Sequence, residues 1–312
     1  MKETGMNTSS LAELIQVNGA GYPEPVRKAA LVELAKGGIH PPAYESAVDD
    51  AIRCRNDALL VLLIQAGASV PPESLGRVIA GGLAKSVQAL MDSAHLSVNA
   101  FDAAGCAPLH LAVEHNQVEI VRLLLNNEKI QVNVQDADGS TPLLRAAARG
   151  HAACMRELLN YEPVNGQKLD VNLMNKRHRT PLMVAVLNNR LPCVHLLLSA
   201  EGVEVNCKSV NQRTPLSVAA GQGLLPCIHA LLSSEKVDVN TRDRYGMTPL
   251  MHAQEREHWK CVRLLRLYTR NAPCTPVEKD GGVKKKTLCC ALVAALALIC
   301  GMVGYLVKDC MM

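Results

Sequence analysis

Apolar residues in the middle of the chain form short clusters at helical spacing, and polar breaks separate the clusters at a regular interval. The clearest clusters contain a proline followed by a leucine, in the segments APLHLA, TPLLRA, TPLMVA, TPLSVA and TPLMHA. Their prolines are Pro108, Pro142, Pro181, Pro215 and Pro249, so successive clusters lie 34, 39, 34 and 34 residues apart. A recurring interval of this size indicates an internal structural repeat.

Residues 209–242 illustrate what one unit predicts. Thr214 is expected to cap a helix with its side chain, and Pro215 takes the first helical position, where its missing N–H costs nothing. The segment GQG ends this helix, and a second helix follows with apolar residues at helical spacing. Those residues are Ile228, Leu231 and Leu232. Neither helix can bury its apolar face alone, so the units are expected to stack into a solenoid with a continuous core.

The unit resembles the ankyrin repeat, whose signature is a Thr-Pro-Leu-His box, two antiparallel helices and a β-hairpin finger ending in Val-Asn. The box histidine is present only at His110. A glycine stands at the family's finger position in three units, as Gly105, Gly139 and Gly246. The other two units carry His178 and Gln212 there, and we expect altered turns in their fingers.

The resemblance implies a mainly α fold, an ankyrin-repeat solenoid of about seven to eight helix-turn-helix units. Five well-matched repeats occupy residues 99–268, and two degenerate repeats are expected in 41–98. Residues 1–40 are predicted to form an N-terminal helical cap. A flexible linker over 269–286, a transmembrane helix over 287–307 and a short luminal or exoplasmic tail over 308–312 complete the predicted organisation.

Composition argues for a binding module and against an enzyme. The chain is 48% hydrophobic but only 3% aromatic, with a formal net charge of +4, so no polyanionic partner is implied. No arrangement typical of catalysis is visible, and the sequence predicts neither a cofactor nor a metal site. Four cysteines stand 12 residues after their box prolines, as Cys154, Cys193, Cys227 and Cys261. Equivalent positions in stacked units are too far apart for disulfides, so these thiols are expected to be buried core groups.

The fingers hold the candidate partner-binding residues. Ankyrin-like proteins generally bind other proteins with their fingers and first helices, and three successive fingers here are cationic. The candidates are Lys176, Arg177, Arg179, Arg213, Arg242, Arg244 and Tyr245. They predict a protein partner with an acidic segment, since arginine and tyrosine are enriched at binding hot spots; ordinary solvated charge is the alternative. The patch lacks interleaved aromatic residues, which argues against a nucleic-acid partner.

The resemblance implies a second kind of candidate site at the Val-Asn positions. The ankyrin family includes substrates of asparagine hydroxylation at the asparagine that precedes a finger. Four asparagines match that position, namely Asn133, Asn172, Asn206 and Asn240. Their expected principal role is structural, because a short amide side chain bonds the backbone near a turn.

The chain ends in an apolar run, TLCCALVAALALICGMVGYLV, preceded by Lys284, Lys285 and Lys286. Its 21 residues suffice for a helix that crosses the roughly 30 Å hydrocarbon core of a bilayer. The lysines favour a cytosolic N-terminus, so the chain resembles a tail-anchored, single-pass protein. The flanking residues favour the endoplasmic reticulum over the mitochondrial outer membrane. Cys289 and Cys290 at the boundary are candidates for lipidation.

These features together predict a membrane-anchored scaffold or adaptor that presents its solenoid to the cytosol and recruits a protein partner. A host-directed ankyrin effector of an intracellular microbe, anchored in a host membrane, would have the same architecture. A soluble regulator whose apolar tail is buried by a partner is a further alternative. Partner identity and organelle remain open at this level.

Overall fold

A computed structural model of the chain describes residues 41–65, 68–93, 97–163, 166–234 and 236–269. Within these ranges the chain forms fourteen α-helices and no strand. The predicted cap over 1–40, the predicted span over 287–307, the tail over 308–312 and almost all of the linker over 269–286 lie outside the described residues. In the described ranges, no helix combines the length and the apolar composition that crossing a bilayer requires.

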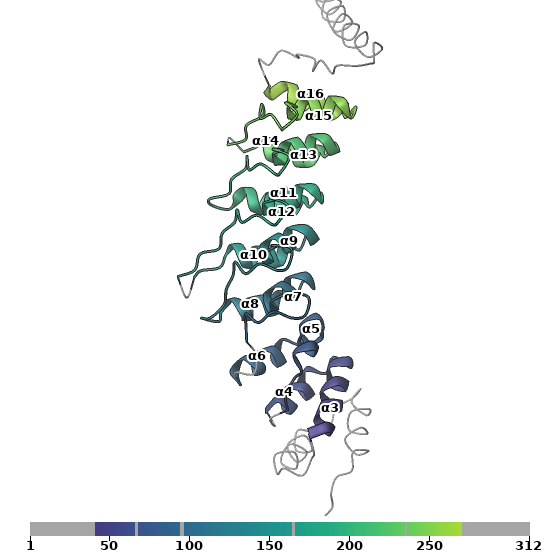
Figure 1. Ribbon diagram of the computed structural model, residues 1–312, viewed down its shortest axis with the longest axis vertical. Coiled ribbons are helices and arrows are strands. Elements are labelled where there is room, and N and C mark those ends of the chain that lie inside the picture. The colour runs from purple at the N-terminus through teal and green to yellow at the C-terminus, as the bar shows by residue number, and fades with distance from the viewer. Residues whose placement is uncertain (1–40, 66–67, 94–96, 164–165, 235, 270–312) are drawn as a thin grey trace, which may run out of the picture. The chain divides into compact units, whose positions relative to one another are not determined.

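The helices follow one another in pairs (Figure 1). The first helices of the pairs are α3 (Pro41–Arg53), α5 (Pro72–Ala80), α7 (Pro108–Glu114), α9 (Pro142–Arg149), α11 (Pro181–Leu187), α13 (Pro215–Gln222) and α15 (Pro249–Glu255). The second helices are α4 (Asp57–Gln65), α6 (Ala84–Asp92), α8 (Val118–Leu125), α10 (Ala152–Leu159), α12 (Leu191–Ser199), α14 (Leu225–Leu232) and α16 (Trp259–Tyr268).

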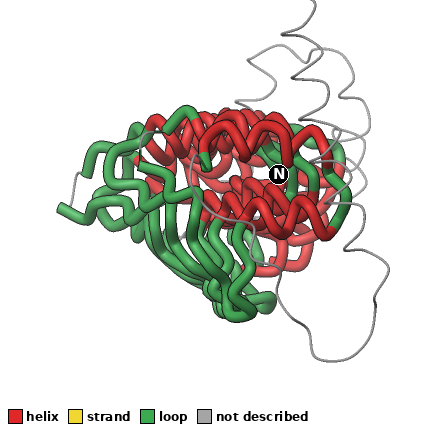
Figure 2. Tube along the Cα trace, turned by 90° about the horizontal axis from the view of Figure 1, so that it is seen from above, coloured by secondary structure: helices red, strands yellow, loops and turns green. Residues whose placement is uncertain are grey.

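Each helix packs against its pair partner and against the equivalent helix of the neighbouring pair. The first helices form one layer, in which α9 contacts α7 and α11, and α13 contacts α11 and α15. The second helices form the other layer, from α4 to α16. Figure 2, which looks along the stack, shows the loops gathered beside the two helical layers. The described residues thus form the helical solenoid that the repeat pattern predicts.

Threonine caps start the first helices of four pairs. The hydroxyls of Thr141, Thr180, Thr214 and Thr248 each accept a hydrogen bond from the backbone N–H three residues later, and a proline follows each threonine. In the first well-matched repeat Ala107 has no hydroxyl. There the His110 N–H donates to the Ala107 carbonyl at 2.9 Å, and the His110 ring adds two bonds: Nδ1 accepts from the Ala107 N–H at 3.2 Å and Nε2 donates to the Ser140 carbonyl at 2.9 Å. Burial lowers the pKa of His110, which suits this neutral form.

The core between the layers consists mostly of aliphatic side chains and cysteines. The four equivalent cysteines, Cys154, Cys193, Cys227 and Cys261, are buried and unbonded to one another. Burial raises the pKa of their thiols, to about 11 for Cys154. The expectation that they act as small core groups is therefore confirmed.

Candidate partner-binding surface

Five tight turns project from the loop side of the solenoid, and we call them fingers 1 to 5. They comprise residues 102–106, 136–140, 175–179, 209–213 and 243–247. In every finger the first residue donates its backbone N–H to the carbonyl of the fifth residue, at 2.9 to 3.2 Å. The fourth residue donates back to the carbonyl of the first. A single closed turn of this kind is too short to form a ladder, so the expectation of β-hairpin fingers is wrong for the described residues.

The expectation of altered turns in fingers 3 and 4 is also wrong. His178 and Gln212 adopt left-handed backbone, with φ of 51° and 58°, and Gly139 in finger 2 has φ of 72°. The same pair of backbone hydrogen bonds closes all three turns. A non-glycine residue in this conformation costs roughly 1–2 kcal/mol, which the surrounding fold supplies. Finger geometry is therefore uniform, and only the side chains change from one finger to the next.

In four of the five fingers the first residue also holds the turn with its side chain. Asp136 Oδ1 accepts from the N–H groups of Asp138 and Ser140, both at 2.8 Å. Equivalent pairs of bonds reach Asp102, Asn175 and Asp243. Finger 4 begins instead with Ser209, whose backbone alone closes the turn.

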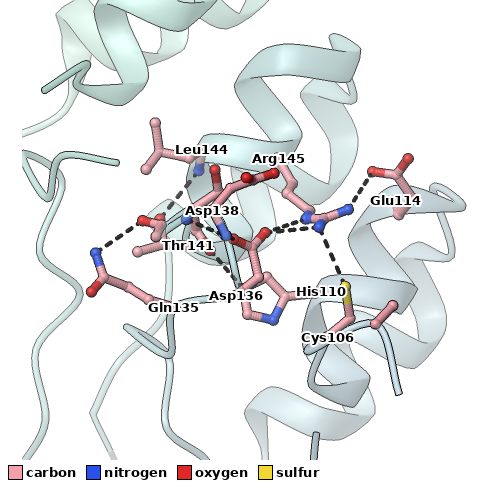
Figure 3. A network of polar contacts seen from close by, with 12 residues as sticks. Cys106, His110, Glu114, Gln135, Asp136, Asp138, Thr141, Leu144 and Arg145 are labelled. Carbon is pink, nitrogen blue, oxygen red and sulfur yellow. Dashed lines mark hydrogen bonds and ion pairs between the residues drawn. The ribbon is translucent and has the colours of Figure 1, made fainter. Parts of the chain in front are cut away.

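In finger 2 the second carboxylate oxygen of Asp136 is held by an arginine from the first-helix layer (Figure 3). Arg145 of α9 lies 2.8 Å from Asp136 Oδ2 and 3.3 Å from Glu114 of α7, and its Nη2 also donates to Cys106 Sγ. Burial alone would raise the pKa of Asp136, but the Ser140 N–H and the Arg145 guanidinium outweigh it and lower that pKa. The carboxylate of Asp136 is therefore neutralised inside the fold, whereas the second acid of this finger, Asp138, is exposed.

Finger 5 uses the same device with a histidine. Asp243 Oδ2 lies 2.8 Å from Nε2 of His252 in α15, and both side chains are buried. Nε of Arg213, in finger 4, lies 3.4 Å from the same oxygen. Arg213, which was expected to contact a partner, thus contacts the carboxylate of finger 5 with its Nε.

Four of the five fingers show a link to the helix that follows them; in finger 1 the partly exposed Asp102 is followed nine residues later by Leu111. Asp136 and Asp243 are followed nine residues later by the cationic or polar Arg145 and His252. The uncharged finger residues Asn175 and Ser209 are followed at the same interval by Val184 and Val218. A buried carboxylate requires a partner, whereas an amide or hydroxyl leaves the helix position free to be apolar. Sequence reasoning missed this coupling, although the nine-residue interval was visible.

The cationic candidates of finger 3 lie at the surface. Lys176 and Arg177 are exposed and Arg179 is partly exposed. Within the described residues none of the three makes an ion pair. The Lys176 backbone N–H donates to the Asp138 carbonyl at 3.1 Å, which joins fingers 2 and 3.

Fingers 4 and 5 add apolar groups to this surface. Val210 and Tyr245, at the two tips, are each more than half exposed. The Arg244 guanidinium lies 5.5 Å from the centre of the Tyr245 ring, and the Arg244 N–H donates to the Asn211 carbonyl at 3.2 Å. Arg242 is exposed and bonds the Gly246 carbonyl. We call Lys176, Arg177, Val210, Arg244 and Tyr245 the finger-tip surface.

Three of the four candidate hydroxylation asparagines join consecutive repeats. Asn133 donates its amide to the Lys168 carbonyl at 2.8 Å and accepts from the Asp170 N–H at 2.9 Å. Asn172 and Asn206 make the same pair of bonds one repeat further on. The equivalent partners of Asn240, residues 270 and 272, lie outside the described residues. The structural role is thus confirmed for these three, and hydroxylation stays a prediction.

Two further expectations concern what the chain lacks or what lies in its tail. In the described ranges no group of three or more histidine, cysteine, aspartate or glutamate side chains could hold a metal ion. Cys289 and Cys290, the lipidation candidates, lie outside those ranges.

Comparison with known proteins gives the class of this chain. A family model described as ankyrin repeats (3 copies) matches residues 50–136, 128–209 and 200–274. Since these matches cover more than half of the sequence, the chain belongs to the ankyrin-repeat family. The fold of this family is typically a non-enzymatic module for protein interaction.

A solved structure supports the fold. The crystal structure of EF0377, an ankyrin repeat protein, is similar with a TM-score of 0.56 and 21% sequence identity. The similarity covers 63% of this chain and 98% of that chain. At this identity the likeness concerns the fold alone. None of the curated proteins compared with the chain matches it.

Proposed function

We propose that this protein is a membrane-attached adaptor whose finger-tip surface binds an acidic segment of a protein partner. One observation supports this binding surface: acidic finger residues Asp136 and Asp243 are buried and paired, whereas Lys176 and Arg177 are exposed and make no ion pair with any described residue. The fold therefore neutralises these two carboxylates and leaves the two cations for another molecule. Tyr245 and Val210 beside them offer apolar contact, so a partner segment with acidic and apolar side chains fits best.

The finger-tip test reverses three exposed charges in the variant K176E/R177E/R244E. Arg213 is left intact, because a glutamate there would face the buried carboxylate of Asp243. The probe is a labelled peptide of alternating glutamate and leucine, with a lysine–leucine peptide as the charge control. We expect the variant to bind the acidic peptide roughly tenfold or more weakly, since three favourable charge contacts become repulsive. Fluorescence anisotropy measures the affinity.

The matched control for this test is K85E/K129E/R156E. These three residues are exposed, make no ion pair within the described part of the chain, and belong to α6, to the segment after α8 and to α10, outside all five fingers. The control has the same net charge as the finger variant and is expected to bind like the unaltered protein. Equal weakening in both variants would mean that net charge alone drives binding, and undiminished binding by the finger variant would contradict the proposed surface. Affinity capture with the same variants would then identify cellular partners.

Membrane attachment is proposed from the sequence of residues 284–312, three lysines followed by an uncharged run of 21 residues. The full chain is expected to stay in the membrane pellet after extraction with alkaline carbonate. A chain that ends at residue 283 is expected in the supernatant, because it lacks the apolar run. Release of the full chain would contradict the anchor and favour a soluble regulator whose tail is covered by a partner.

We propose a cytosolic N-terminus and the endoplasmic reticulum as the destination, on the same flanking charges. Protease added to intact microsomes would then digest the solenoid and spare only a fragment containing the span. Protection of the solenoid would contradict this orientation.

A further inference from the structure

The last described helix, α16, exposes large apolar side chains that the other second helices do not. Trp259 is 63% exposed, Leu267 66% and Tyr268 49%. Trp259 stands ten residues after its box proline. The residues at that position in the four preceding repeats are Val118, Ala152, Leu191 and Leu225, which are smaller and pack against the core.

Cations alternate with Trp259 and Leu267 on one face of α16, and Tyr268 lies outside that face. Lys260, Arg263 and Arg266 are all exposed. At roughly 100° per residue, an arc of about 120° contains Arg266, Trp259, Arg263, Leu267 and Lys260 in that angular order. The opposite side of the helix, with Cys261, Val262 and Leu265, is buried against α15 and α14. The exposed face is therefore one continuous strip of basic and apolar side chains.

No acid balances this strip within the helix, because the sequence of α16, WKCVRLLRLY, contains neither aspartate nor glutamate. The second helices α4, α6, α8 and α10 each contain an acidic residue, and α12 and α14 contain neither an acid nor a lysine or arginine. Arg122 of α8, for example, pairs with Glu157 of α10 at 2.8 Å. The three cations of α16 make no ion pair within the described part of the chain. Their charge is thus available to an external anion.

We propose that this face of α16 binds the headgroup region of an anionic lipid bilayer. The proposal rests on the membrane attachment proposed above, and it adds a second contact made by the solenoid itself. Tryptophan rings favour the membrane–water interface, and lysine and arginine bind anionic headgroups there. The eighteen residues 269–286 also keep α16 within roughly 60 Å of the start of the apolar run, even when fully extended.

A lipid surface fits this face better than a protein segment does. Its apolar and basic groups are interleaved along a whole helix, and no acceptor side chain on the strip would orient a particular partner. The finger-tip surface differs, because its Arg244 side chain lies against the Tyr245 ring and its backbone is hydrogen-bonded between neighbouring fingers. The two surfaces belong to different layers of the molecule, so each can be tested while the other is intact.

The only tryptophan in the chain is Trp259, so intrinsic tryptophan fluorescence reports on this face directly. The full chain is reconstituted into vesicles of phosphatidylcholine alone, or of equal parts phosphatidylcholine and phosphatidylserine. Brominated lipids are included in a parallel set as contact quenchers. We expect the emission of Trp259 to move to shorter wavelength and to be quenched by bromine only in the anionic vesicles. Added salt should reverse both effects, because it screens headgroup attraction.

The test variant is K260E/R263E/R266E, compared with the same control, K85E/K129E/R156E. Each basic residue near an anionic surface contributes roughly fivefold to binding, so losing three lowers the ratio of docked to undocked helix by about 100-fold. The control, with equal net charge, should show the unaltered emission shift. A thermal melt followed by circular dichroism checks that both variants fold, as expected for substitutions at exposed positions.

The outcomes separate this inference from the membrane attachment. A chain that floats with both kinds of vesicle but keeps a solvent-exposed Trp259 overturns the α16 contact and leaves the attachment standing. A chain that floats with neither contradicts both. Emission at short wavelength in neutral and anionic vesicles alike, unchanged by the charge reversal, also overturns the proposal, since it means that protein rather than lipid covers this face.

Discussion

Replacing Asp243 with alanine is expected to lower the free energy of unfolding by about 3 kcal/mol, because it removes a buried carboxylate that several groups share. That carboxylate accepts from the N–H groups of Tyr245 and Met247, at 2.9 and 3.0 Å, and bonds the ring of His252. Without it, finger 5 loses the bonds that set its turn. The buried ring of His252 loses its partner as well. Urea denaturation measures the change.

The exposed Asp138 at the tip of finger 2 supplies the control. Its substitution by alanine removes the same chemical group from a solvated site, and it should change the free energy of unfolding by no more than about 0.5 kcal/mol. Similar losses for the two variants would show that burial and pairing of Asp243 do not stabilise the fold.

The contribution of Asp243 to stability should depend on pH. Burial alone would raise the pKa of Asp243, but the N–H groups of Tyr245 and Met247, together with His252, outweigh it and hold the pKa below the ordinary 3.8. A carboxyl group whose pKa is lower in the folded than in the unfolded protein stabilises the fold at every pH above its unfolded-state pKa. This contribution is lost as the pH falls through the folded-state pKa. The difference in stability between the unaltered protein and D243A should therefore shrink only below about pH 4. A difference that shrinks near neutral pH would contradict this assignment.

The second large effect is expected for Leu182→Ala, at about 3 kcal/mol of lost stability. Leu182 is 1% exposed in α11, which packs against α9, α12 and α13. The equivalent Leu250→Ala in α15 is expected to cost less, about 1–2 kcal/mol, because Leu250 is 7% exposed and α15 contacts first-layer helix α13 on one side. In a solenoid each repeat is stabilised mainly by its neighbours, so a central cavity weakens two interfaces.

Urea denaturation followed by circular dichroism compares the two leucine variants. The central variant should also broaden the transition, because repeats on either side of α11 become less coupled. Equal losses of stability and equally sharp transitions would contradict the argument, since they would indicate that position along the stack does not matter.

Much of the fold could be predicted from the residues. The recurring threonine and proline specify where a helix starts, as the caps at Thr141, Thr180, Thr214 and Thr248 confirm. The equivalent positions of Cys154 and its counterparts indicated a buried line of thiols, and burial is observed. These predictions succeed because they depend on local backbone chemistry and on a periodic apolar face, and both can be recognised in a single sequence.

The fingers were harder to predict. His178 and Gln212 replace glycine, and local preference alone favours a different turn there. The neighbouring hydrogen bonds nevertheless impose the left-handed conformation. Similarly, the sequence predicted Arg213 as a free cation, but in the fold it contacts Asp243, which lies 30 residues further along the chain. Which charges stay available for a partner depends on contacts between repeats, and charge alone could not reveal them.

By itself, the sequence determined the repeat, its helix starts and its core, because capping chemistry and apolar periodicity act over a few residues. It also supplied the uncharged run over 287–307 on which the proposed anchor rests. Only the tertiary structure decided which finger charges are neutralised internally and which face of α16 is exposed. Those outcomes depend on packing between residues from nine positions to about one repeat apart, because a buried carboxylate requires a partner. Among the described helices, α16 contacts only one neighbouring repeat, through α14.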